Sequence, residues 1–205
     1  EIVQGEKVIF EANPYYYKGE PKIKRLEMEI LPPSQQVAAI KAGKYDIVLK
    51  VSPEIFPELE KLDNINILTK KAGSMNYIAF KLGKWDEEKN EVVTDPNSKM
   101  YDLNLRKAIA YAIDMDAVSK QFYHGLSTPA KSQLSPLFPS LHNPEINGFK
   151  QDVEKAKQLL DEAGFKDVDG DGIREGKDGK PVKYTLAMMS GGEIAEPLAQ
   201  YYIQQ

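Results

Sequence analysis

The chain has 205 residues, enough for one large domain or two small ones, and its 41% hydrophobic content suits a globular protein. Its net charge of −4 argues against a nucleic-acid-binding protein, because such proteins present a basic face. It contains no cysteine, so disulfides, thiolate nucleophiles and cysteine-based zinc sites are excluded. No apolar run approaches the roughly 20 residues that a membrane-spanning helix needs.

The first part of the chain alternates strand and helix patterns. Residues 22–30 illustrate the strand pattern, because Leu26 and Met28 fall on one face and Glu27 on the other. The same period of two predicts strands at residues 6–12, 22–30 and 45–51. A short helix is expected over residues 35–42, with Ser34 as its N-cap. The strand, helix and strand form a predicted βαβ unit, whose crossover should be right-handed.

The next stretch is less regular. Ser52 and Pro53 open a further helix, whose regular part is expected at residues 58–62 because Pro57 interrupts its start. Two more strands are predicted, at residues 65–71 and 74–82. The polar residues 85–100 indicate a surface loop or a short hairpin.

The second half of the chain is predicted to be mainly helical. Apolar residues at helical spacing predict a helix that Asp102 caps, and Asp114 caps a second helix that ends near Tyr123. Residues 127–148 contain four prolines and no periodicity, and a domain boundary is placed near Lys131. The remaining expected elements are a helix at 152–163, a Gly/Asp-rich turn at 167–181, a strand at 182–189 and a helix at 194–205.

Five stretches, in order along the chain, resemble the extracellular solute-binding proteins of the oligopeptide/dipeptide family, which serve ATP-driven importers. Three of them are ANPYYYKGEPK at 12–22, AIKAGKYDI at 39–47 and DLNLRKAIAYAIDMDAV at 102–118. The other two are residues 125–139 and 156–181. Each stretch is a weak signal by itself, but the five in this order are a strong one.

The resemblance implies an α/β, two-lobed, type II periplasmic-binding-protein-like fold, with mixed sheets flanked by helices. Residues 1–130 would be part of lobe I, and residues 131–205 the beginning of the second large lobe, within a longer protein. The implied function is extracellular capture of short peptides, trapped between the lobes by hinge closure and delivered to a membrane-embedded ABC permease. The implied protein is a monomeric, surface-anchored lipoprotein or periplasmic receptor that needs no cofactor, binds no nucleic acid and is not an enzyme.

The resemblance also suggests which residues meet the ligand. Asn76 and Tyr77 fall on a predicted strand that runs near the cleft in relatives. Lys131, Ser132 and Gln133 follow the entry into the second lobe. Tyrosine and glutamine side chains can form hydrogen bonds with the backbone groups of a peptide. Bridging water molecules would let the site accept peptides with different side chains. The alternative interpretation is that Tyr77 packs in a core or at a sheet edge and that Lys131 is a solvated loop residue.

An Asp-rich stretch fits the template of a calcium-binding loop. Its carboxylates fall at positions 1, 3, 5, 9 and 12 of the template, with a glycine at position 6: Asp167, Asp169, Asp171, Glu175, Asp178 and Gly172. Position 12 is Asp rather than the bidentate Glu, and no helix pattern follows. A plain Gly/Asp turn is therefore the competing interpretation, and any bound calcium would be structural.

Several other patterns leave alternatives open. Tyr15, Tyr16 and Tyr17 could form a stacking platform, but aromatic residues at a strand end more often pack. His124 and His142 lack ligand spacing, and residues 190–192 lack the surroundings of a nucleophile elbow. Rival functions are binding of a nickel complex, haem or oligosaccharide by the same fold, and a calcium-dependent adhesion module. A metal-dependent enzyme built on Asp169 and Asp171 would lack an acid/base partner and a nucleotide cradle.

Overall fold

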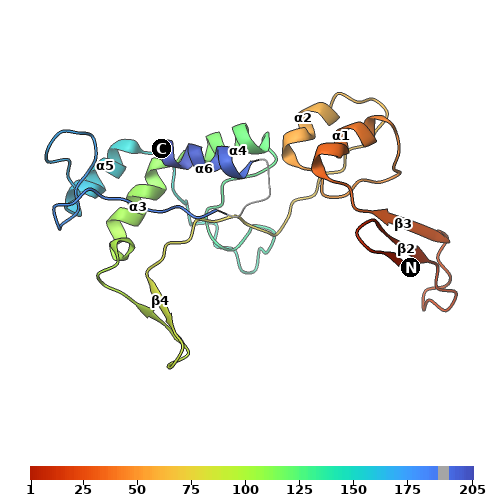
Figure 1. Ribbon diagram of the computed structural model, residues 1–205, viewed down its shortest axis with the longest axis horizontal. Coiled ribbons are helices and arrows are strands. Elements are labelled where there is room, and N and C mark those ends of the chain that lie inside the picture. Colours follow the sequence, from red (N-terminus) through yellow and green to blue (C-terminus); the bar gives the residue numbers. More distant parts are fainter. Residues whose placement is uncertain (189–193) are drawn as a thin grey trace. The chain divides into compact units, whose positions relative to one another are not determined.

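A computed structural model describes residues 1–188 and 194–205 of the chain (Figure 1). The chain divides into two compact units, Glu1–Ile65 and Asn66–Gln205. In the described part of the chain, none of the helices has the length and apolar character needed to cross a membrane.

The first unit contains a small antiparallel sheet in the order β1-β2-β3, made of β1 (Ile2–Val3), β2 (Lys7–Glu11) and β3 (Arg25–Glu29). Phe10 lies opposite Leu26, and Ile9 lies opposite Glu27. Because directly opposed residues share a face, the sheet has one apolar face and one mainly charged face. The strands predicted at residues 6–12 and 22–30 are confirmed, as is the separation of their two faces.

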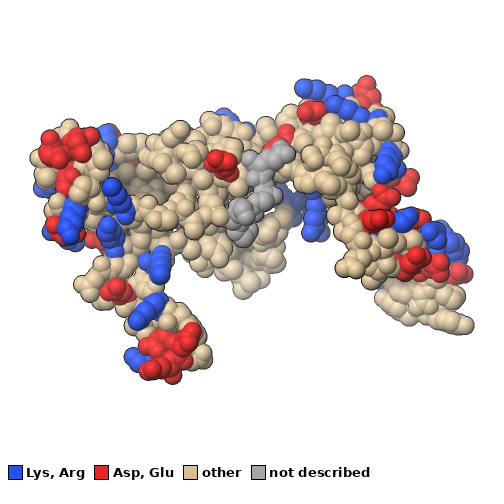
Figure 2. Space-filling view, in the orientation of Figure 1, with Lys and Arg blue, Asp and Glu red and all other residues tan. Residues whose placement is uncertain are grey.

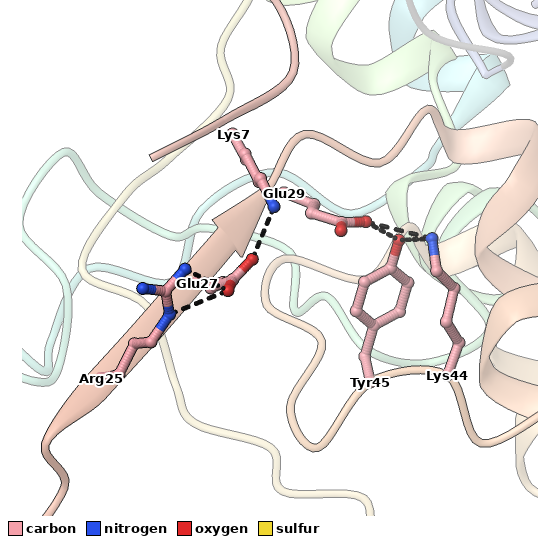
Figure 3. A network of polar contacts seen from close by, with 6 residues as sticks. All are labelled: Lys7, Arg25, Glu27, Glu29, Lys44 and Tyr45. Carbon is pink, nitrogen blue, oxygen red and sulfur yellow. Dashed lines mark hydrogen bonds and ion pairs between the residues drawn. The ribbon is translucent and has the colours of Figure 1, made fainter. Parts of the chain in front are cut away.

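Charged side chains are linked across one face of this sheet (Figure 3). Glu27 accepts a hydrogen bond from Lys7 Nζ at 2.7 Å and bonds from Arg25 Nε at 3.0 Å and Nη2 at 2.8 Å. These contacts raise the pKa values of Lys7 and Arg25 and lower the pKa of Glu27, in each case mainly through the side-chain hydrogen bonds. The network therefore joins β2 to β3 by side chains as well as by the backbone ladder.

A second set of contacts attaches the chain after helix α1 (Pro33–Lys41) to β3 (Figure 3). Glu29 accepts hydrogen bonds from the Tyr45 hydroxyl at 2.6 Å and from Lys44 Nζ at 3.1 Å. Helix α1 confirms the helix predicted at residues 35–42. It begins one residue earlier than Ser34, with Pro32 at the N-cap and no capping side chain, so the assignment of Ser34 as cap was wrong.

Three segments predicted as strands, residues 45–51, 65–71 and 74–82, have no strand pairing in the described structure. Several of their apolar side chains are open to solvent, and Ile47 is 74% exposed. The βαβ expectation is therefore wrong here, and the described strands pair only antiparallel. The physical reason is that alternation reports the two faces of a strand, whereas a strand also needs a neighbouring backbone.

The first unit ends in a short helical turn, η1 (Pro53–Ile55), which continues into α2 (Phe56–Leu59). The start at Pro53 agrees with the prediction, but the helix lies earlier than residues 58–62. Pro57 stands in the first turn of α2, where its missing N–H costs no helical hydrogen bond. Leu59 is the buried residue of this helix.

The first paired strands of the second unit are β4 (Gly83–Asp86) and β5 (Glu91–Thr94), a hairpin that confirms the short-hairpin alternative for residues 85–100. A short turn, η2 (Lys99–Tyr101), then leads into the helices. In Figure 2 the far end of the hairpin, below the helices, carries a cluster of acidic side chains.

The core of the second unit lies between α3 (Leu103–Ala112) and α5 (Val153–Glu162). Ala108 packs in one buried cluster with Ala156 and Leu159, and Leu105 packs in another with Phe165. The helix α4 (Met115–Tyr123) follows α3 directly. Each of these three helices has an aspartate at its N-cap, whose side chain accepts a hydrogen bond from a backbone N–H of the first turn: Asp102, Asp114 and Asp152. The three predicted helices are thus confirmed, as are the predicted caps Asp102 and Asp114, and Asp152 caps the third helix, which begins one residue later than predicted.

The end of the second unit is partly irregular. Lys166 and Glu175 form an isolated bridge, and Glu175 forms another with Pro181. Residues 182–188 show no strand pairing in the described structure, so the predicted strand is not formed there, and residue 189 lies outside the described residues. The final helix, α6 (Ala195–Gln204), confirms the helix predicted at residues 194–205.

Candidate functional site

A polar hollow lies between the end of α3 and the start of α5, with a volume of about 520 Å³. Its lining is Tyr111, Lys131, Asn147, Gly148, Lys150, Gln151 and Asp152. Gly148 makes this arrangement possible, because its φ is +68° and a Cβ there would lie 3.1 Å from Lys131 Cα. The chain that enters the predicted second lobe is thereby held against the residues that precede α5.

The walls of this hollow are fixed by hydrogen bonds. The Asp152 backbone N–H donates to the Tyr111 carbonyl at 2.8 Å. Gln151 Nε2 donates to the Ala112 carbonyl and to Gln205 Oε1, both at 2.9 Å. The Tyr111 ring meets the Phe149 ring edge-on at 5.0 Å between centroids. The end of α3 is therefore tied to the segment that leads into α5, which gives the hollow a firm frame.

The chemistry of the hollow is that of recognition. Amide, phenol and ammonium groups can donate to or accept from a polar ligand. Lys131 and Lys150 contribute positive charge, and Asp152 contributes a carboxylate that already accepts from the Lys155 N–H at 2.8 Å. Such a lining suits hydrogen bonding to polar backbone groups, either directly or through water.

In the described part of the chain, no hydrogen bond joins Asn76 or Tyr77 to the other three predicted ligand-binding residues. Lys131 lines the hollow, whereas Gln133 is exposed and the Ser132 hydroxyl donates to the Leu134 carbonyl at 3.1 Å. Asn76 Nδ2 lies 3.5 Å from the Tyr123 hydroxyl. Tyr77 is 78% exposed, so within this unit it does not have the core position weighed against a binding role. Their part in ligand binding stays a prediction.

Apart from Lys131, the residues of the hollow are not among the predicted ligand-binding residues. Tyr111 falls within the predicted helix that Asp102 caps, and Asn147, Lys150 and Gln151 fall in or just after the proline-rich stretch without periodicity. The dipeptide Asn147-Gly148 is a turn signal that could have marked the close approach. The partner of that approach, Lys131, could not be read from local sequence, because it is a tertiary contact.

The Asp-rich loop gathers part of its predicted metal set. One carboxylate oxygen from each of Asp167, Asp169 and Glu175 lies within 4.8 Å of the others, but Asp171 and Asp178 are outside this group. Glu175 is buried and accepts a hydrogen bond from the Val168 N–H at 2.9 Å.

The loop's own backbone already uses these carboxylates. Asp167 accepts hydrogen bonds from the Gly170 N–H at 2.6 Å and the Gly172 N–H at 2.9 Å. Asp171 accepts from the Ile173 N–H at 2.7 Å. Side-chain bonds of this kind are what hold an aspartate-rich turn together without an ion. The geometry therefore favours the plain turn, and calcium binding stays a prediction.

The remaining candidates are the tyrosines of the first unit, the two histidines and residues 190–192. The Tyr16 and Tyr17 rings meet edge-on at 4.8 Å, and Tyr17 is 80% exposed, so this pair is not packed in the first unit. His124 ends α4 in the left-handed conformation, and His142 Nδ1 lies 2.7 Å from the Leu134 carbonyl oxygen. Residues 190–192, considered as a nucleophile turn, lie outside the described residues.

Comparison with known proteins gives matches along the whole chain. The family model described as bacterial extracellular solute-binding proteins, family 5 Middle, matches residues 1–205. The oligopeptide-binding protein OppA of Lactococcus lactis subsp. lactis is 35% identical over 205 residues, which is 100% of this chain and 34% of that protein.

Solved structures of oligopeptide-binding proteins also align with the whole chain or nearly all of it. Lactococcal OppA, complexed with an endogenous peptide in the closed conformation, aligns with a TM-score of 0.87 and 34% identity over 99% of this chain. AppA from Bacillus subtilis, in complex with a nonapeptide, aligns with a TM-score of 0.67 and 27% identity over 100% of this chain. The matched region is 38% of each of those structures, so the chain spans little more than a third of the proteins it resembles.

Proposed function

Because the chain belongs to the bacterial extracellular solute-binding proteins of family 5, we propose that it is part of a receptor that binds short peptides for an ATP-driven importer. The observation that carries this proposal is the likeness, over 99% of the chain, to a lactococcal oligopeptide-binding protein solved with its peptide. The family is one of solute-binding receptors outside the membrane, which also agrees with the recognition chemistry of the hollow.

The fold-class prediction is confirmed by this likeness, since the chain carries part of the two-lobed, type II periplasmic-binding fold. Within that fold we assign residues 1–130 to lobe I and residues 131–205 to the beginning of the second large lobe. The boundary between the two compact units, at residues 65 and 66, follows from contacts within the described chain. It is not the lobe boundary, which we place near residue 131.

The proposed mechanism is capture by closure. A peptide lies between the lobes and is held through its backbone groups, which favours the closed state because the ligand contacts both lobes. Asn76 and Tyr77 act from one segment, and Lys131, Ser132 and Gln133 act from the other. The receptor works as a monomer, at the cell surface as a lipoprotein or in the periplasm, and passes its ligand to a membrane-embedded permease without catalysing a reaction.

The test is a ligand screen by thermal unfolding of the full-length protein. A peptide that binds only the folded state should stabilise it by about 2.7 kcal/mol at a concentration 100 times its Kd. Haem, a nickel–histidine complex and an oligosaccharide provide the competing arms. We expect a rise in Tm with a mixed pool of short peptides. A rise with one of the other ligands and none with peptides would overturn the proposal.

A further inference from the structure

The chain between α4 and α5, a loop in Figure 1, contains the one Asn-Gly pair of the sequence, Asn147-Gly148. Both residues are exposed, and neither belongs to a helix or a strand. When glycine follows asparagine, its backbone nitrogen can reach the side-chain carbonyl carbon of the asparagine, because no Cβ hinders the approach. Attack at that carbon removes the side-chain amide, so this pair is a candidate for chemical modification.

The nitrogen that would attack is free of hydrogen bonds. In the part of the chain that the structure describes, the Gly148 N–H donates to no acceptor, and the Asn147 side chain has no hydrogen-bond partner. The hydrogen bonds on either side come from the Ile146 N–H, which donates to the Asn143 carbonyl, and from the Gln151 side chain. The Asn147 side chain can therefore rotate towards Gly148 without first breaking a hydrogen bond of the loop.

The Asp-rich loop provides a contrast, because aspartate before glycine closes the same ring with loss of water. It contains three such pairs: Asp169-Gly170, Asp171-Gly172 and Asp178-Gly179. The Gly170 and Gly172 N–H groups donate to Asp167 at 2.6 Å and 2.9 Å. The Gly179 N–H donates to the Gly176 carbonyl at 2.9 Å. Local opening has to break these bonds before the nitrogen can attack, so the fold protects the three Asp-Gly pairs and leaves Asn147 unprotected.

We propose that Asn147 is a site of spontaneous deamidation in the folded protein. The Gly148 nitrogen loses its proton to solvent and forms a bond to Asn147 Cγ. The Cγ–Nδ2 bond breaks, and ammonia leaves with a proton taken from solvent. Water then opens the resulting succinimide ring. Cleavage between the ring nitrogen and Cγ gives aspartate, and cleavage between that nitrogen and the main-chain carbonyl carbon gives isoaspartate. The net reaction consumes water and releases ammonia, with no change of oxidation state.

The modification alters the polar hollow, which Asn147 and Gly148 help to line. Either product adds a carboxylate to a lining that includes Lys131 and Lys150. Isoaspartate also adds a methylene group to the main chain just before Gly148. Gly148 packs closely on Lys131, since a Cβ on the glycine would lie 3.1 Å from Lys131 Cα. The longer main chain displaces Gly148 and thereby loosens the segment that begins at Lys131. This effect does not depend on which solute the receptor binds.

The test compares reaction rates in the folded and the denatured full-length protein, both incubated at mildly alkaline pH. Mass spectrometry of proteolytic peptides measures the conversion of Asn147 from amide to acid. Chromatographic separation of isomeric peptides measures the reaction at the three Asp-Gly pairs. We expect folding to slow the reaction of Asn147 by less than about threefold and that of the Asp-Gly pairs by at least roughly tenfold. Suppression of Asn147 by the same factor as the Asp-Gly pairs would overturn the proposal.

Two controls show whether the reaction belongs to Asn147. Asn147→Gln has a longer side chain, which would have to close a larger and less favourable ring. Asn143 lies in the same loop but precedes Pro144, whose nitrogen has no proton to lose. We expect no deamidation above background at residue 147 of the variant or at Asn143. Release of ammonia from folded Asn147→Gln at the rate of the unaltered protein would assign the reaction to another residue and overturn the proposal.

Hydrogen exchange measures the effect on the hollow. The deamidated full-length protein is compared with fresh protein and with fresh Asn147→Asp, which adds the charge without lengthening the main chain. We expect the amides of residues 131–133 to exchange at least about threefold faster in the deamidated protein than in either of the others, with α3 as the unchanged reference. Asn147→Gln incubated in the same way should keep the exchange of its fresh form. Equal exchange in the deamidated protein and in either comparison would overturn the proposed displacement of Gly148.

Discussion

Gly83 occupies a position in the hairpin that has no room for a side chain. A Cβ built there would lie 2.0 Å from the Val93 carbonyl oxygen and 2.7 Å from Thr94 Cα. Both atoms belong to the backbone of the paired strand, which cannot move away without losing the ladder. The absence of a side chain is therefore a condition of the pairing of Gly83 with Thr94.

We expect Gly83→Ala to open the hairpin, because the clash costs at least about 3 kcal/mol, the upper end of ordinary overpacking penalties. Trp85, the only tryptophan of the chain, lies in β4 and reports the change through its fluorescence. Lys84→Ala is the matched control, because it removes a side chain from the same strand without adding a clash. An unchanged emission spectrum for Gly83→Ala would contradict this prediction.

Asp102 links the start of α3 to the Asp-rich loop. Its carboxylate accepts from the backbone N–H groups of Asn104 and Leu105, and Lys177 Nζ lies 3.2 Å away. Burial alone raises the pKa of Asp102, but the hydrogen bonds from Leu105 and Lys177 outweigh it, so the pKa lies below the usual 3.8. A lowered folded pKa means that the ionised group stabilises the protein above pH 3.8.

The stabilisation by ionised Asp102 should disappear as the pH falls from about 4 through the folded pKa. We expect Asp102→Asn, which keeps a capping oxygen but no charge, to be less stable at neutral pH and to lose part of this acid dependence. Denaturant unfolding of the full-length protein between pH 2 and 7 measures it. Asp116→Asn, at an exposed carboxylate, is the control. Parallel stability–pH curves for the Asp102 variant and the unaltered protein would count against the assignment.

Asp167 decides between the turn and the calcium loop. Since its two oxygens already accept the Gly170 and Gly172 N–H groups, we expect Asp167→Ala to lose about 1–3 kcal/mol with or without calcium. We expect a chelator to leave the Tm of the unaltered protein in place. A rise in Tm with calcium that Asp167→Ala abolishes would instead establish the metal site.

At the level of elements, helices followed from local sequence, whereas strands followed from it only where the partner strand is near in the chain. The aspartate caps and the 3.6-residue spacing lie within a few residues of each helix, so α3, α4 and α5 could be predicted with nearly correct ends. The strands β2 and β3 were predicted because each finds the other nearby in the chain. Residues 45–51 and 74–82 carry the same alternation without a nearby partner, and a local pattern holds no information about a distant one.

The candidate site divides in the same way. Lys131 was chosen from a family resemblance, and its contact with Gly148 could not be predicted because the two residues meet only after the chain folds back. The loop from Asp167 was recognised as a turn because its glycines and aspartates act on their own neighbours. Local chemistry is readable from the sequence, and convergence of distant segments is not.

The pairing of α3 with α5 depends on small side chains at the contact. Ala108 is 2% exposed and packs with Ala156 and Leu159. We expect Ala108→Leu to destabilise the protein by about 1–3 kcal/mol through overpacking. Lys107→Leu introduces the same side chain on the exposed face of the helix and should change stability by less than about 0.5 kcal/mol. Equal effects of the two substitutions, measured by denaturant unfolding, would show that the contact between α3 and α5 can accommodate a larger side chain.

For the whole molecule, the central expectation is that two separate segments act on one ligand. In the full-length protein we expect Asn76→Ala and Lys131→Ala each to weaken binding of the same peptide by roughly 5- to 30-fold, from loss of about 1–2 kcal/mol of hydrogen bonding. Isothermal titration calorimetry measures the affinities. Lys84→Ala, on the exposed hairpin, is the control. Unchanged affinity in both variants, with Tm preserved, would remove these residues from the site.

Charge and cysteine content also led to predictions about the class of protein. An acidic, cysteine-free chain was predicted to be neither a nucleic-acid-binding protein nor a thiol enzyme, and the family match places it among solute receptors. The identity of the family came from five short stretches in the right order. Which solute is bound depends on side chains from segments that are brought together by folding, which is why the ligand specificity could not be derived from the same stretches.

The contact between α3 and α5 also bears on how fast this unit can fold. Residues 113–152 separate the two helices, so each helix can start to form early, but their shared core is completed only after that long stretch has been drawn into a loop. The entropy lost in bringing the ends together must be spent before any apolar contact between the helices compensates for it. Refolding of the second unit should therefore be limited by the meeting of the two helices, and shortening the intervening stretch should accelerate it.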